Sequence, residues 1–152
     1  MNEKLASILN EAIQDEYKAR ALYQKVIEKF GEVRPFSNIV EAENRHIQAL
    51  LPLFELYGLP VPPDDWPSRV QAPSSLLEAC QQGVEAEIEN MEMYARLLEQ
   101  SKDFPEVQGV LRELQRASKE NHLPAFQRCV ARETKDGRGH GFRRGGVRTR
   151  DC

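Results

Sequence analysis

Five side chains of types that commonly bind metal ions lie on the apolar faces of predicted helices, and these are Glu16, Glu43, His46, Glu87 and His122. Three carboxylates directed into one apolar interior lose hydration and repel one another, so the interior requires protons or cations. Glu43 and His46 are three residues apart, a spacing that places both on one helix face, where they can hold one ion. Carboxylate and imidazole ligands without thiolate suit iron or manganese, with zinc as an alternative. The set predicts a metal site, and the simpler alternative is five separately partnered polar groups.

Four amphipathic helices are predicted to position these residues, because apolar side chains recur at three- and four-residue spacing in segments 2–30, 36–57, 76–100 and 105–133. Gly31 and Gly58 follow the first two segments, and Ser75 is a candidate N-cap for the third. At 1.5 Å per residue, the candidate ligands on the first three helices differ in height by less than ~10 Å. His122 falls somewhat higher, and Pro124 is expected to kink the last helix just past it. We therefore expect one site near the middle of a bundle.

The connections between these segments predict the topology. The short connections 31–34 and 101–104 make the first and second helices antiparallel, and likewise the third and fourth. Segment 59–72 contains four prolines, so it is not helical, and its fourteen residues can reach ~45 Å, more than the ~33 Å of the second helix. The expected fold is an all-α, ferritin-like four-helix bundle with one long crossover between helices two and three. The alternative is an up-down bundle with a loose loop.

The two halves of the chain repeat one pattern, in which a glutamate precedes a tyrosine by seven residues and, on the next helix, another residue precedes a histidine by three. The pairs are Glu16 and Tyr23, Glu87 and Tyr94, Glu43 and His46, and Lys119 and His122. Lys119 thus stands where the first half has a carboxylate. This predicts one well-formed metal position and a weak or empty second one, with the Lys119 ammonium neutralising a glutamate. We expect the tyrosines to hydrogen-bond the glutamates, with electron relay as the alternative.

Two of these motifs resemble those of a known family. Residues 16–23, EYKARALY, resemble the E-x-x-A-R-x-x-Y of rubrerythrin first helices, and Glu43 with His46 resembles the E-x-x-H of their second helices. Residues 120–126, ENHLPAF, resemble the fourth helix of uncharacterised bacterial ferritin-like domains. The chain is therefore similar, over residues 2–133, to the rubrerythrin and erythrin branch of the ferritin-like superfamily.

The resemblance implies a non-haem, carboxylate-bridged di-iron centre. It also implies the activity of an iron oxidase or peroxidase, which reacts with oxygen or peroxide. The implied ligands of the centre are Glu16, Glu43, His46, Glu87 and His122. Asn90 and Lys119 stand where the family has further glutamates, which leaves one ion or two as alternatives. Because the chain has no C-x-x-C rubredoxin segment, such an activity implies an external electron donor. A metal-free four-helix interaction or scaffold module is the alternative from another functional class, and storage in a hollow ferritin shell is a third.

Composition adds further expectations for the 152 residues. The chain has no run of 18 apolar residues and no basic-then-apolar N-terminus, so we expect a soluble, cytoplasmic protein without membrane contact. Three widely spaced cysteines indicate no disulfide framework, and Cys80 and Cys129 are expected to be apolar core fillers. Residues 1–133 are expected to form the bundle. Residues 134–152, glycine-rich and with a charge of +4 against −7 for the rest, are expected to be disordered. The expected partner is a second copy, in a homodimer, and not nucleic acid.

Overall fold

The computed structural model of the chain describes residues 2–139, and the regular elements in this range are all helical. The α-helices are α1 (Asn2–Phe30), α2 (Phe36–Leu56), α3 (Leu76–Gln100), α4 (Pro105–Ala117) and α5 (Leu123–Gly139). A 3-10 turn, η1 (Trp66–Ser68), lies in the connection after α2, and a π-helical turn, η2 (Ser118–His122), joins α4 to α5. The predicted all-α bundle is confirmed. Within residues 2–139, no helix is both long enough and apolar enough to cross a membrane.

The first three helices lie where the apolar spacing predicts them, and Ser75 caps α3 by accepting a hydrogen bond from the Glu78 backbone N–H. The predicted fourth helix is instead α4, η2 and α5 in sequence. The kink expected just past His122 is instead a widened turn, η2, which ends at His122. Helix α5 also continues to Gly139, so residues 134–139 of the predicted disordered segment are helical. The remainder of that segment, 140–152, lies outside the described residues.

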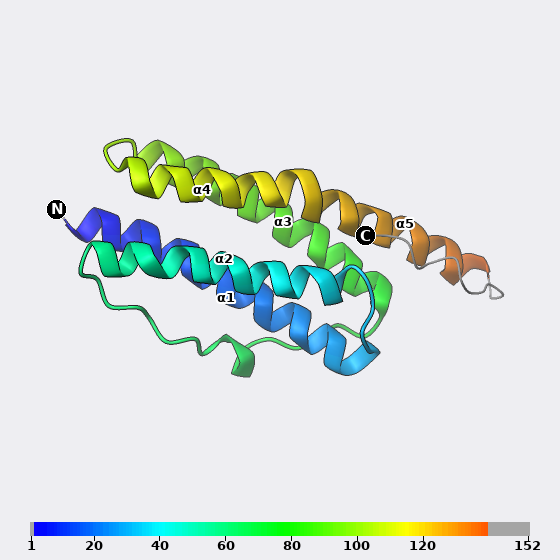
Figure 1. The fold of residues 1–152 in the computed structure, drawn as a ribbon. Coiled ribbons are helices and arrows are strands. Elements are labelled where there is room, and N and C mark those ends of the chain that lie inside the picture. Colours follow the sequence, from blue (N-terminus) through cyan, green and yellow to red (C-terminus); the bar gives the residue numbers. More distant parts are fainter. Residues whose placement is uncertain (1, 140–152) are drawn as a thin grey trace.

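The connection between α2 and α3 runs along α1 for the length of the bundle (Figure 1). Three side chains of α1 hold it in place. The Tyr17 hydroxyl donates to the Pro62 carbonyl at 2.8 Å, Gln14 accepts from the Trp66 indole N–H at 2.7 Å, and Arg20 pairs with Asp64 at 3.1 Å. Helix α3 begins at the end of the bundle where α1 ends, so α2 and α3 run in the same direction (Figure 1).

Two apolar clusters fill the core, one on each side of a buried polar layer. On α1, for example, Ile13 belongs to one cluster and Tyr23 to the other, and Glu16 lies between them. The buried polar residues are Glu16, Glu43, His46, Glu87, Asn90, Ser101, Ser118 and His122. All of them except Ser101 come from the middle of the bundle, where α1, α2, α3 and η2 contribute polar side chains with apolar packing above and below.

Helices α3 and α5 are joined covalently, because Cys80 and Cys129 form a disulfide with 5.6 Å between their Cα atoms. The prediction of two free thiols acting as apolar fillers is wrong. The two cysteines are 49 residues apart and fit no local motif, and only the antiparallel packing of α3 on α5 brings them together. The same contact explains Gly83, where an added Cβ would lie 2.5 Å from the Phe126 ring.

Candidate metal centre

The first candidate ligand group combines α1 and α2. Glu16 comes from α1 and Glu43 and His46 from α2, and their exposed fractions are 1%, 3% and 8%. His46 Nδ1 lies 3.2 Å from Glu16 Oε1 and 3.4 Å from Glu43 Oε1. One ligand atom from each residue lies within 4.8 Å of the other two, so this group could hold a metal ion.

The second group combines α2, α3 and η2, and it uses Glu43 again. His122 Nδ1 lies 3.4 Å from Glu87 Oε1 and 3.6 Å from Glu43 Oε2. The ligand atoms of Glu43, Glu87 and His122 also lie within 4.8 Å of one another. Glu43 therefore presents Oε1 to one group and Oε2 to the other, as a bridging carboxylate would. Because both groups offer three ligands, the structure does not support the expectation of a weak second position.

Two buried atoms of the second group lack a hydrogen-bond partner. These are Glu87 Oε1 and His122 Nδ1, although they lie only 3.4 Å apart. Buried polar atoms are nearly always partnered, and an exception requires an explanation such as an ion. A cation between the two atoms would satisfy both, so the residues present fit a metal.

The two tyrosines of the repeat hold the outer glutamates from across the bundle. The Tyr94 hydroxyl of α3 donates to Glu16 Oε2 of α1 at 2.5 Å, and the Tyr23 hydroxyl of α1 donates to Glu87 Oε2 of α3 at 2.8 Å. Burial raises the pKa of both tyrosines well above 10, and the neighbouring glutamates raise it further, so both remain donors. The hydrogen-bonding role predicted for them is confirmed. Each tyrosine leaves the Oε1 atom of its glutamate facing the centre.

The pKa values of the neighbouring carboxyl groups of Glu16 and Glu43 shift in opposite directions. Burial raises the pKa of Glu43 well above its usual value, and the charge of Glu16 raises it further. Burial also acts to raise the pKa of Glu16, but hydrogen bonds from Glu43, His46 and Tyr94 outweigh it and lower the pKa to about 2. Of the two carboxyl groups, Glu43 is thus the one that binds a proton more readily. A metal ion bound here would replace that proton.

Lys119 does not take part in the centre. It is exposed on η2, and the neighbouring Ser118 is buried instead. The Ser118 hydroxyl donates to Asn90 Oδ1 at 2.7 Å, and Asn90 Nδ2 donates to Asp15 Oδ2 at 2.7 Å. The prediction that Lys119 neutralises a glutamate is therefore wrong. A π-helical turn contains an additional residue, which turns the position three before His122 out of the core.

Asp15 is a polar group near the centre that the sequence pattern does not reveal. Burial raises its pKa to about 7, against an opposing hydrogen bond from Asn90, and the charge of Glu16 raises it further. Asp15 precedes Glu16 and so lies about 100° away around α1, on the face that the apolar pattern assigns to solvent. The close approach of α3 covers that face, and the sequence contains no signal for this.

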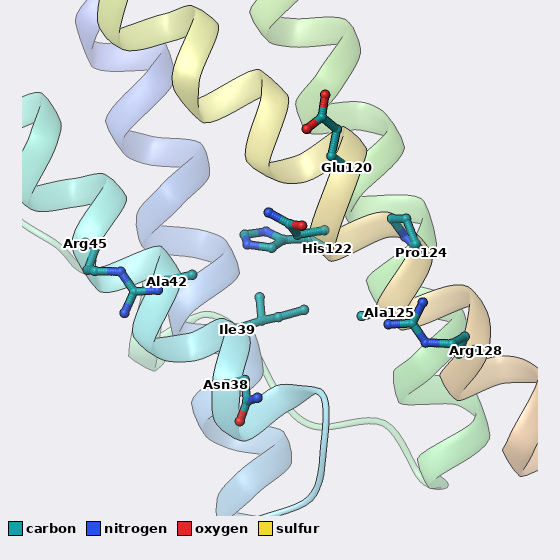
Figure 2. A pocket seen from close by; sticks show the side chains of 10 residues that line it. Asn38, Ile39, Ala42, Arg45, Glu120, His122, Pro124, Ala125 and Arg128 are labelled. Atoms are coloured by element: carbon teal, nitrogen blue, oxygen red, sulfur yellow. The ribbon is translucent and has the colours of Figure 1, made fainter. Parts of the chain in front are cut away.

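One wall of the centre borders a pocket of about 320 Å³ that opens between α2 and the η2–α5 segment (Figure 2). Its lining residues are Asn38, Ile39, Ala42, Arg45, Glu120, Asn121, His122, Pro124, Ala125 and Arg128. His122 thus belongs both to the second ligand group and to the pocket wall.

No family model matches the sequence, and neither does any curated protein. A solved structure, that of the hypothetical protein MJ0754 from Methanococcus jannaschii, is similar in fold, with a TM-score of 0.76. The two share 23% sequence identity over 88% of this chain and 82% of that one. This similarity supports the helical-bundle architecture and leaves the function to be argued from the centre itself.

Proposed function

We propose that this protein is a ferritin-like metal-binding protein of the rubrerythrin type that holds two metal ions, iron foremost, joined by Glu43. The observation that carries the proposal is the pair of buried three-residue groups that share this carboxylate. The unpartnered atoms of Glu87 and His122 support it, since a cation satisfies both. The motifs of α1 and α2 and the connection that runs the length of the bundle support the ferritin-like assignment.

Iron held by carboxylates and imidazoles exchanges electrons with oxygen or peroxide, and this is the oxidoreductase chemistry we assign to the bound centre. The protein's own contribution is positioning and proton control. Tyr23 and Tyr94 fix the outer glutamates by hydrogen bonds. Glu43 gives up its proton when cations bind, because their charge offsets the burial and repulsion that hold the proton there. The reducing equivalents come from an external donor, since the chain contains no C-x-x-C rubredoxin segment.

Metal content per chain tests this proposal, measured by elemental mass spectrometry after anaerobic reconstitution with Fe(II). The wild type is expected to bind two ions. Because His46 and His122 belong to different groups, His46→Gln and His122→Gln should each retain one ion, whereas Glu43→Gln should lose both. Glu41→Gln is the matched control, since Glu41 is exposed on the same helix.

The outcomes separate the functional classes. One ion in the wild type, lost in His46→Gln and kept in His122→Gln, would indicate a mononuclear protein. No ion in any variant, with no thermal stabilisation by Fe(II) or Mn(II), would overturn the proposal in favour of a metal-free scaffold. Oxidation of the loaded protein by oxygen or by hydrogen peroxide, followed by absorbance, then distinguishes an oxidase from a peroxidase.

A further inference from the structure

The pocket between α2 and the η2–α5 segment has the size and lining of a small-molecule site. Its volume of about 320 Å³ lies within the ~300–1,000 Å³ that such sites occupy. Ile39, Ala42, Pro124 and Ala125 supply apolar surface from both walls, and His122 reaches from η2 into the space between them (Figure 2). An organic molecule could therefore lie on the apolar side chains and reach the imidazole.

The charges of the lining favour an anion. Figure 2 shows Arg45 on α2 and Arg128 on α5 at opposite sides of the pocket. Neither guanidinium forms a hydrogen bond or ion pair within the described part of the chain, whereas Arg20 and Arg96 are bound to carboxylates. Glu120 also lines the pocket, but its carboxylate points away from both arginines (Figure 2). Two unpaired guanidinium groups present the planar donor geometry that carboxylates accept.

His122 connects this pocket to the metal centre. Its Nδ1 atom has no solvent access and faces Glu43 and Glu87, so the 4% of the residue that is exposed belongs to its other atoms. A metal-binding histidine usually donates its second ring N–H to a carboxylate, a carbonyl or water. Among the described residues, the Nδ1 contacts to Glu43 and Glu87 are the polar contacts of this ring. An anion in the pocket would supply the missing acceptor.

A second cavity near the centre is much smaller than this pocket. It lies between α1 and α3, is lined by Asp15, Glu87 and Asn90 among others, and holds only about 30 Å³. That volume accommodates about one water molecule. Of these two cavities, only the one beside His122 can therefore admit an organic molecule.

We propose that the pocket between Arg45 and Arg128 binds a small organic acid, a dicarboxylate whose two carboxylate groups are held by the guanidinium groups at opposite sides of the pocket, with His122 between them. Its apolar part lies on the side chains of Ile39, Ala42, Pro124 and Ala125. Binding of the acid needs no metal, and its role as a ligand that acts on the centre through His122 rests on the proposed function.

Isothermal titration calorimetry with succinate tests the pocket on the full chain, both metal-free and loaded with Fe(II) under anaerobic conditions. Arg45→Gln and Arg128→Gln should each weaken succinate binding about tenfold, because each removes one charge-assisted contact. Arg112→Gln is the matched control, since Arg112 is exposed on α4 outside the pocket. Succinamide, which has the same skeleton without charge, should not bind. Circular dichroism melts establish that each variant is folded.

The proposal is overturned by any of three results: no saturable succinate binding at millimolar concentration, equal weakening in Arg112→Gln, or tight binding of succinamide. Inorganic phosphate is titrated in parallel, and binding of phosphate without succinate would overturn the assignment to carboxylates. Succinate binding that depends on Arg45 and Arg128 in a chain that binds no metal would refute the proposed function and leave the pocket intact. Because His122 borders both, the two forms should differ in succinate affinity, and equal affinities would overturn the link through its ring.

Discussion

Replacing Glu43 by glutamine should have opposite effects on the metal-free and metal-loaded protein. Glu43 lies between both ligand groups and is 3% exposed. Glutamine has the same shape and retains an N–H donor for Glu16, but it needs no proton and cannot bridge two cations. The substitution therefore removes a binding group and a buried acid at the same position.

The size of the effect follows from the proton that Glu43 holds. Burial and the charge of Glu16 keep the pKa of Glu43 well above its usual value, whereas an exposed glutamate has a pKa of about 4.3. The unfolded chain releases this proton at its ordinary pKa, so holding it in the folded protein at pH 7 costs at most about 4 kcal/mol. Glu43→Gln should thus stabilise the metal-free protein by up to about 4 kcal/mol, or about 10 °C in melting temperature for a chain of this length.

Thermal melts and urea unfolding at pH 7, with and without Fe(II), measure both effects. Wild type should gain stability with metal, and Glu43→Gln should gain none because both sites are lost. Glu41→Gln, an exposed substitution on the same helix, should behave as wild type within about 0.5 kcal/mol in either state.

Two results would refute this reasoning. A metal-free Glu43→Gln protein that melts at or below the wild-type temperature would show that Glu43 holds no costly proton. A variant that still binds two ions would show that Glu43 is not the shared ligand.

Three further predictions concern groups around the centre. Burial raises the pKa of Asp15 from 3.8 to about 7, so folding takes up a proton and the stability of the metal-free protein should fall as pH rises from about 4 to 7. In thermal melts, Asp15→Asn should show a smaller dependence of melting temperature on pH, and an unchanged dependence contradicts this. Reduction of the Cys80–Cys129 disulfide, or replacement of both cysteines by alanine, should lower the free energy of unfolding in urea by about 2–4 kcal/mol, because the bond closes a loop of 49 residues. Equal urea midpoints with and without the disulfide would count against this. Gly83→Ala should lower the free energy of unfolding by about 1–3 kcal/mol in the same assay, because the added Cβ meets the Phe126 ring. Gly109→Ala has open space around its Cβ and should raise the free energy of unfolding by about 0.5–1 kcal/mol. Similar effects at both positions would argue against the packing explanation.

The sequence by itself determined the helices and the inward position of the five candidate ligands. Apolar periodicity is a local property, so the bounds of α1, α2 and α3 follow from it closely. Glu16, Glu43 and His46 interrupt apolar stripes, so their burial can be predicted from their positions in the sequence. The prolines of segment 59–72 likewise indicated a connection that is not an α-helix.

Only the tertiary structure decided which atoms meet. The sharing of Glu43 between two groups depends on how far α3 and η2 lie from α2, and no spacing along the chain encodes that distance. The π-helical turn places Lys119 at the surface, because the wider turn changes the angle between this position and His122, whereas Ser118 stays on the buried stripe. The pairing of Cys80 with Cys129 and the covering of Asp15 arise in the same way. Contacts between distant segments depend on packing of whole helix faces, whereas periodicity reports only which face is apolar.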